Sequence, residues 1–383
     1  MSASGSGSGS GAAERLAEKL LLVGVSPDEV DAAIERGELG LLAVDRLLVQ
    51  GRVELTRTQV AERAGVDLAL AERLWRAMGF ADLPDDEVAF TTVDVEMLAT
   101  VKSYLDTGVL DEQTLVQMTR VVGGSMARVA EAQMSLLQER MAIAGLSGVE
   151  AVEFALALIA VFERNWERMF GYVHLRQLQA VTKRATFIDD DDGSGRARGP
   201  VLAVGFADLV GFTVLSQALD EHELAQVVDH FENVAYETIG RNGGRVVKMI
   251  GDEVMFVADD PADAARIGLS LSESYGVDDT VSDVRVSVAC GPVLAHEGDY
   301  FGPVVNLAAR LVNIAYAGSV VVSQEVYELL SDSDEFGWKP IRPRRLKGIG
   351  VVPLWAVTRP GEGRGLATEV ASRIRAHRRG RKQ

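Results

Sequence analysis

The sequence predicts an α+β protein in which an all-helical segment precedes a ferredoxin-like βαββαβ segment. Apolar residues recur at helical spacing through 12–184, whereas short β-forming runs alternate with helical patterns through 201–360. A charged, Gly-rich stretch at 185–200 separates the two patterns and predicts a linker. We therefore expect two domains, with a flexible Gly/Ser-rich tail at 1–11 and a basic tail at 361–383.

Composition and charge narrow the class of protein. The chain has 383 residues, a net charge of −17 at pH 7 and a single cysteine, Cys290. The acidic balance argues against nucleic-acid or anionic-membrane binding, and the lone cysteine is typical of a reducing compartment. No signal peptide is evident, and the most apolar segment, Phe154–Phe162, is too short to span a membrane. We therefore expect a cytoplasmic protein without a transmembrane segment.

Capping residues and glycines predict where individual helices begin and end in the helical half. Ser26 before Pro27 predicts a helix start with Ser26 as N-cap. Gly123-Gly124 and Gly145 predict breaks between the later helices, and Val149–Ala185 is predicted to be one long helix.

Leu55–Phe80 resembles a helix-turn-helix with Gly65 at the turn, which makes DNA binding one hypothesis. Its second helix carries Arg73 and Arg76 but also Glu72, and four acidic residues follow within 82–87. Few donors remain for DNA phosphates, so a structural helical hairpin is the favoured interpretation.

The second half predicts a regular order of elements. These are a strand at 201–207, a helix at 213–240, strands at 245–250 and 253–258, a helix at 261–275, a strand at 283–290 and a helix at 303–314, followed by shorter elements. The first six form the βαββαβ unit, whose helices cover one face of the sheet.

Two aspartates are expected at one end of this sheet. Gly251-Asp252 lies between two β-forming runs and predicts a tight hairpin, and Asp208 ends the first strand. If these strands are neighbours, both carboxylates lie at the same sheet edge. Such hard oxygen ligands suit Mg²⁺ that also holds the phosphates of a nucleotide, although each aspartate alone is equally an ordinary turn residue.

Five further residues are candidates, although each has an ordinary structural interpretation. Lys248 lies in an apolar strand, Asp299 in a loop and Lys347 in a turn, where such residues are usually solvated. Asn306 and Arg310 are four residues apart on a mostly apolar helix and therefore share a face. This pair either caps a neighbouring element or contacts a ligand.

Taken together, these residues resemble the class III nucleotidyl cyclase domain. The resemblance covers Val201–Thr358 and is carried, in order, by Phe206–Thr213, Lys248–Glu253, Asp299–Arg310 and Leu346–Gly348. Four motifs in register are far more specific than any one of them.

The resemblance implies a role for each candidate. Asp208 and Asp252 bind two Mg²⁺ or Mn²⁺ ions, Lys248 and Asp299 read the adenine of ATP, Asn306 orients the ribose, Arg310 stabilises the transition state and Lys347 holds phosphate. It also implies a head-to-tail homodimer. In each site of that dimer one chain supplies the two aspartates, and the other chain supplies Lys248, Asp299, Asn306 and Arg310. The expected activity is that of an adenylyl cyclase, which converts ATP to cyclic AMP and pyrophosphate.

Ala12–Arg184 resembles the helical regulatory domain of soluble actinobacterial adenylyl cyclases, including acid-sensing members. This resemblance implies dimerisation and control of the catalytic domain through Val149–Ala185. It also implies pH or a fatty acid as regulator. The apolar segment Phe154–Phe162 is compatible with a lipid pocket, although packing in a protein core is the favoured interpretation. The candidate titrating groups are His174, His222, His230 and His296, together with the acidic run Asp189–Asp192.

Two other functions are weighed against this one. The first is a DNA-binding regulator that senses nucleotide with a degenerate cyclase domain, which the intact candidate residues and the acidic helical half argue against. The second is a diguanylate cyclase, which shares the ferredoxin-like core. The hairpin Ile250-Gly251-Asp252-Glu253 lacks the Gly-Gly-Asp/Glu-Glu-Phe turn of that class.

Overall fold

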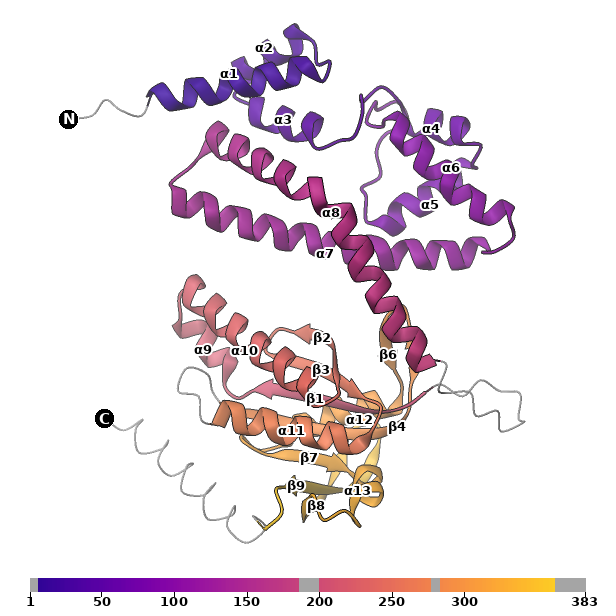
Figure 1. Cartoon of the computed structure of the whole chain (residues 1–383), viewed down its shortest axis with the longest axis vertical. Coiled ribbons are helices and arrows are strands. Elements are labelled where there is room, and N and C mark those ends of the chain that lie inside the picture. Colours follow the sequence, from indigo (N-terminus) through magenta and orange to yellow (C-terminus); the bar gives the residue numbers. More distant parts are fainter. Residues whose placement is uncertain (1–5, 186–199, 277–282, 362–383) are drawn as a thin grey trace, which may run out of the picture. The chain divides into compact units, whose positions relative to one another are not determined.

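The computed structural model describes residues 6–185, 200–276 and 283–361 and divides into two compact units, Met1–Asp189 and Asp190–Gln383 (Figure 1). The first unit is helical and the second combines a mixed sheet with helices, so the predicted α+β class is confirmed. In the described residues, no helix has the length and apolar character needed to cross a membrane.

The helical unit contains eight helices within the described residues. They are α1 (Ser6–Leu22), α2 (Pro27–Arg36), α3 (Leu39–Leu47), α4 (Arg57–Ala64), α5 (Leu68–Met78), α6 (Thr92–Asp106), α7 (Glu112–Ala144) and α8 (Gly148–Ala185). Ser26 caps α2 as predicted, because its side chain accepts a hydrogen bond from the Glu29 N–H. The predicted long helix at 149–185 is α8.

Two helix boundaries differ from the prediction. Helix α1 begins at Ser6, six residues before the predicted start, because each residue added to a formed helix adds a backbone hydrogen bond. Helix α7 continues through Gly123 and ends only at the C-cap Gly145. A Cβ atom at Gly123 would lie 2.5 Å from the Met78 Cα, so glycine here permits close packing of α7 on α5 and does not break the helix.

The second unit, which we call the sheet unit, has nine strands in the described residues. They are β1 (Val201–Leu209), β2 (Arg245–Ile250), β3 (Glu253–Ala258), β4 (Val284–Pro292), β5 (Leu294–His296), β6 (Asp299–Phe301), β7 (Val320–Ser323), β8 (Gly337–Leu346) and β9 (Gly350–Thr358). Seven form a sheet in the order β2-β3-β1-β4-β7-β9-β8, and β5 pairs with β6 separately. The order of the first four, with antiparallel neighbours, is that of the predicted βαββαβ unit.

Five helices accompany these strands: α9 (Phe212–Ala218), α10 (Glu221–Arg241), α11 (Pro261–Gly276), α12 (Pro303–Val312) and α13 (Gln324–Leu330). The single helix predicted at 213–240 is wrong, because the chain forms α9 and α10. Leu219 is extended, and Asp220 starts α10 with a capping box in which it exchanges hydrogen bonds with Glu223.

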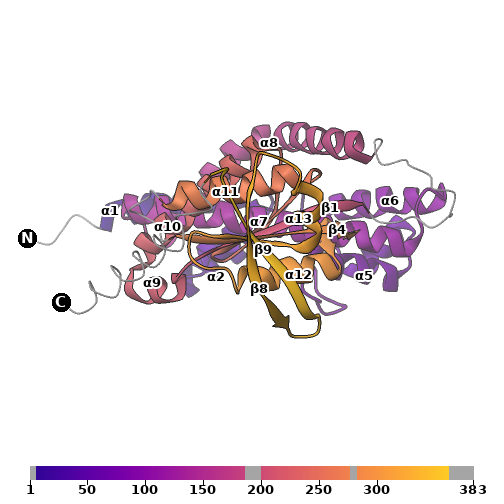
Figure 2. The same cartoon turned by 90° about the horizontal axis from the view of Figure 1, so that it is seen from below.

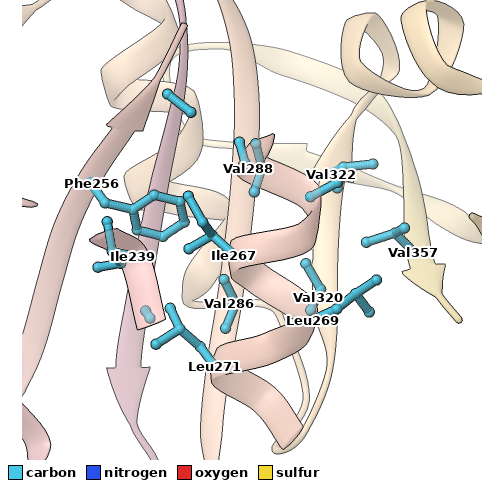
Figure 3. Close-up of a cluster of buried hydrophobic side chains, with 14 of the residues drawn as sticks. Ile239, Phe256, Ile267, Leu269, Leu271, Val286, Val288, Val320, Val322 and Val357 are labelled. Atoms are coloured by element: carbon cyan, nitrogen blue, oxygen red, sulfur yellow. The ribbon is translucent and has the colours of Figure 1, made fainter. Parts of the chain in front are cut away.

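The sheet is covered on both faces. Side chains of α10 and α11 pack against one face, as predicted for the βαββαβ unit, and α12 packs against the other. Figure 2 shows α11 and α12 on opposite sides of the strands. In the core under α10 and α11, Phe256 lies beside Ile239 and Ile267 (Figure 3). The absent side chain of Gly205 makes room for the Phe256 ring.

The predicted linker lies largely outside the described residues, as do the basic tail beyond Gly361 and the acidic run Asp189–Asp192.

Candidate active site

Asp208 lies at the end of β1, between two charged residues on the neighbouring strands. In the sheet register it is opposite Glu253 on β3 and Arg285 on β4. Residues opposite each other across strands present their side chains on the same face. Arg285 Nε donates a hydrogen bond to Asp208 Oδ2 at 2.5 Å, and Asp208 is only 8% exposed. The carboxylate is therefore held in one orientation.

Asp252 lies beside this group in the turn between β2 and β3. Gly251 takes a positive φ of 63°, as the predicted tight hairpin requires. The Leu209 N–H donates to the Asp252 carbonyl oxygen at 3.0 Å, which ties the turn to the end of β1. The structure thus brings Asp208 and Asp252 to the same end of the sheet, as the sequence suggested.

The charges of this carboxylate cluster are not balanced by the protein. Burial and the nearby Asp208 and Asp252 charges raise the pKa of Glu253 to about 7. Burial also raises the pKa of Asp208, even though the hydrogen bond from Arg285 opposes that shift. Three carboxylates face one guanidinium, so a divalent cation fits the cluster electrostatically.

The donor set limits how such a cation is held. Within the described residues no group of three or more His, Cys, Asp or Glu side chains is arranged as a metal site. Two carboxylates can hold a cation that takes its other ligands from water and phosphate, which is the usual environment of Mg²⁺ at nucleotide sites.

Lys248 and Asp299 form an ion pair although they are 51 residues apart in sequence. Lys248 Nζ donates to Asp299 Oδ2, and the Tyr300 N–H donates to Asp299 Oδ1 at 2.8 Å. Both side chains keep part of their surface exposed, 40% for Lys248 and 27% for Asp299. The pair presents a donor and an acceptor side by side.

The α12 helix carries Asn306 and Arg310. Its apolar face, with Ala308, Leu311 and Val312, is buried, while Asn306 is exposed. Arg310 is half-buried, and its Nη1 is fully buried without a hydrogen-bond partner.

The turn after β8 lies against Arg310. A Cβ atom at Gly348 would be 3.5 Å from Arg310 Nη1, and the adjacent Lys347 is exposed. A buried guanidinium nitrogen that lacks an acceptor, with a lysine beside it, suits an anionic group such as phosphate.

The predicted histidines are scattered over several elements. His174 is exposed on α8, and His222 contacts Gln226 at 2.9 Å on α10. His230 is half-buried on the same helix, and His296 is exposed on β5 with Glu297 at 3.7 Å. One of them lies near the site, because His296 is directly opposite Asp299 in the pairing of β5 with β6.

The arginines of the segment that resembles a helix-turn-helix form ion pairs within the helical unit. Arg73 pairs with Glu112 at 3.1 Å, and Arg76 pairs with Glu72 at 3.7 Å and with Asp82 at 3.4 Å. Both arginines of α5 therefore already have carboxylate partners, which supports the structural interpretation of this hairpin.

The sequence did not predict four residues that lie near the site: Glu253, Arg285, Arg245 and Tyr300. A signal for Arg285 existed, because a charged residue within the apolar run 284–290 needs a partner. Identifying that partner requires the register between β1 and β4, which the sequence does not reveal.

Each of the two units matches a known protein family. Residues 6–165 match the family model of the adenylate cyclase regulatory domain, and residues 198–358 match that of the adenylate and guanylate cyclase catalytic domain. An adenylate cyclase of Streptomyces coelicolor is 35% identical over 370 residues, covering 90% of this chain and 96% of the relative.

Two further relatives also match most of this chain. An adenylate cyclase of Glutamicibacter nicotianae is 35% identical over 339 residues, covering 85% of this chain and 84% of the relative. The pH-sensitive adenylate cyclase of Mycobacterium tuberculosis is 31% identical over 360 residues, covering 91% and 89%. The chain therefore belongs to the class III adenylate cyclases that carry an N-terminal adenylate cyclase regulatory domain.

Proposed function

We propose that this adenylate cyclase converts ATP to 3′,5′-cyclic AMP and pyrophosphate at sites that two chains of a homodimer build together. In this reaction the ribose 3′-hydroxyl gives its proton to solvent water, the O3′–Pα bond forms and the bond from Pα to the leaving pyrophosphate breaks. The proposal rests above all on the carboxylate cluster, where Asp208 and Asp252 meet at one sheet end with excess negative charge.

Asp208 and Asp252 would hold the metal ions. Two Mg²⁺ or Mn²⁺ ions bound there would supply a lowered pKa for the 3′-hydroxyl and neutralise the leaving pyrophosphate. Arg285 contributes by fixing the Asp208 carboxylate through its 2.5 Å hydrogen bond.

Arg310 and Lys347 would meet the phosphates. The buried, unpartnered Arg310 Nη1 supports a role in stabilising the charge that develops at phosphorus. Lys347 would hold a phosphate from the exposed side, and Asn306 would orient the ribose.

The Lys248–Asp299 pair would select the base. Lysine donates to adenine N1, and the carboxylate accepts from the N6 amine. Guanine presents the opposite pattern, with a donor at N1 and an acceptor at O6, so this pair favours ATP over GTP.

The exposed apolar surface of α8 supports a homodimer. Phe162, Met169 and Val173 follow one another at helical spacing and are 53%, 49% and 49% exposed. An apolar stripe on one helix face is normally covered, and a second copy of the chain is the predicted partner.

We further propose that α8 and the linker after it carry the state of the helical unit to the catalytic sites. A shared site demands accurate apposition of two chains, so a small shift in the helices that precede them can switch it off. The pH-sensitive relative supports pH as the signal, with the four histidines as candidate groups. A fatty acid stays the second predicted regulator, since Phe154, Val161 and Phe162 expose apolar surface.

Incubation of the pure protein with ATP or GTP, in Mg²⁺ or Mn²⁺, tests the activity directly. We expect cyclic AMP and pyrophosphate as products, and ADP or a linear dinucleotide would contradict the proposal. Regulation is tested by comparing the full chain with a shortened chain that begins at Gly199, across pH and with added fatty acid. Identical profiles for the two chains would contradict control by the helical unit.

A further inference from the structure

A second side-chain bond lies next to the Lys248–Asp299 pair and joins the same two strands. Arg245 lies three residues before Lys248 on β2, and Tyr300 follows Asp299 on β6. Arg245 Nη2 donates to the Tyr300 hydroxyl at 3.3 Å, and its Nη1 donates to Asp259 at 3.0 Å. β2 and β6 are therefore connected at two successive points.

An irregularity in β2 makes this arrangement possible. Residues three apart on a regular strand lie on opposite faces of the sheet. The pairing of β2 with β3 shifts just before Lys248, so that Arg245 is opposite Val257 and Lys248 is opposite Met255. Val257 and Met255 are two residues apart and share a face. The extra residue in β2 thus places Arg245 and Lys248 on the same face, as β-bulges commonly do beside functional sites.

Tyr300 links this bond to the carboxylate of Asp299. Its N–H holds Asp299 Oδ1, while Lys248 holds Oδ2. Its ring packs against the apolar cluster between the sheet and α12. Because β5 and β6 form a sheet of their own, side chains and not main-chain hydrogen bonds position β6 against β2.

We propose that Arg245 and Tyr300 are positioning residues that set the base specificity of the site. Their hydrogen bond fixes the position of β6 along β2. In that position Lys248 presents a donor to the base and Asp299 presents an acceptor. This inference rests on the proposed function, in which that pair recognises adenine.

The test is steady-state kinetics of the full-length protein with ATP and with GTP. Tyr300→Phe keeps the ring and removes the acceptor, and Arg245→Gln removes the cation. We expect each to raise KM for ATP about tenfold and to lower the ATP:GTP ratio of kcat/KM about tenfold, since a hydrogen bond to a charged group is lost. The value of kcat for ATP should change less than about twofold. The contact with the base stabilises the bound substrate and the transition state equally, so its loss affects KM and not kcat.

Two further variants control for indirect effects. Arg245→Lys retains a donor and should keep most of the ATP preference. Tyr236→Phe makes the same chemical change on an exposed residue of α10, and its kinetics should match the parent protein.

The outcomes separate this inference from the function on which it rests. If Lys248→Ala and Asp299→Ala lose the ATP preference while Tyr300→Phe and Arg245→Gln keep it, the positioning role is wrong and the proposed function stands. An equal fall in kcat for both nucleotides with an unchanged ratio would also overturn the role, because that is the effect of a general structural defect. An unchanged preference in Lys248→Ala and Asp299→Ala would overturn both the positioning role and the recognition of the base by this pair, and the proposed cyclase reaction would stand.

Discussion

The two parts of the candidate site are held in place by different kinds of bond. The sheet register sets Asp208 between Glu253 and Arg285, and a main-chain hydrogen bond ties the Asp252 turn to β1. Lys248 and Asp299 lie in different sheets and meet only through side chains. The carboxylate cluster should therefore tolerate changes around it, whereas the Lys248–Asp299 pair should respond to each neighbour.

The largest expected effect is loss of the carboxylates themselves. Asp208→Ala or Asp252→Ala should lower kcat/KM for ATP by more than about 100-fold, because even residues that only support metal ligands change metal affinity by 10- to 100-fold. The main-chain bonds should keep the fold intact, which circular dichroism and the oligomeric state will check. Asp334→Ala on an exposed turn is the matched control. Activity near that of the parent in either site variant would contradict the metal assignment.

The next largest effect is expected from a change at the Lys248–Asp299 pair. The double variant Lys248→Glu, Asp299→Ala should lower the ATP:GTP ratio of kcat/KM by at least about 100-fold, because a site that hydrogen-bonds its ligand strongly rejects the wrong pattern. Product formation from each nucleotide measures this ratio. An unchanged ratio would mean that other residues read the base.

Mixing two inactive variants tests whether the two parts of the site come from different chains. Asp252→Ala and Arg310→Ala chains should together recover about a quarter of the parent activity, because half of randomly formed dimers are mixed and each contains one intact site. Activity is measured after co-expression of the two chains. Proven mixed dimers without recovery would place each complete site within one chain.

The same comparison explains what the sequence could predict. The boundaries of β2 and β3 follow from alternating β-forming residues around Gly251-Asp252, and both appear where predicted. The placement of Asp208 and Asp252 at one sheet end follows from those boundaries once the strands are neighbours. Local pattern is enough when main-chain geometry decides the outcome.

Contacts between segments that are distant in the chain could not be predicted from the sequence. Gly123 was predicted to end a helix, but its role is close contact with Met78, 45 residues earlier. The bonds from Arg285 to Asp208 and from Arg245 to Tyr300 depend on strand register and on a bulge. A single extra residue in β2 moves side chains to the other face, and no local propensity encodes that choice.

The smallest expected effect concerns stability of the metal-free carboxylate cluster. The pKa of Glu253 is about 7 in the folded protein and 4.5 ordinarily, so between these values the folded state binds more protons than the unfolded state. The free energy of unfolding contributed by Glu253 should therefore fall as pH rises from 4.5 to about 7 and stay level above that. Glu253→Gln should remove this slope, so the variant gains stability relative to the parent across the same window. Urea unfolding in EDTA at several pH values measures the difference, with Glu237→Gln on the exposed face of α10 as control. A parent-minus-variant difference that does not change with pH would show that Glu253 ionises normally, and burial and the neighbouring carboxylates would then not raise its pKa.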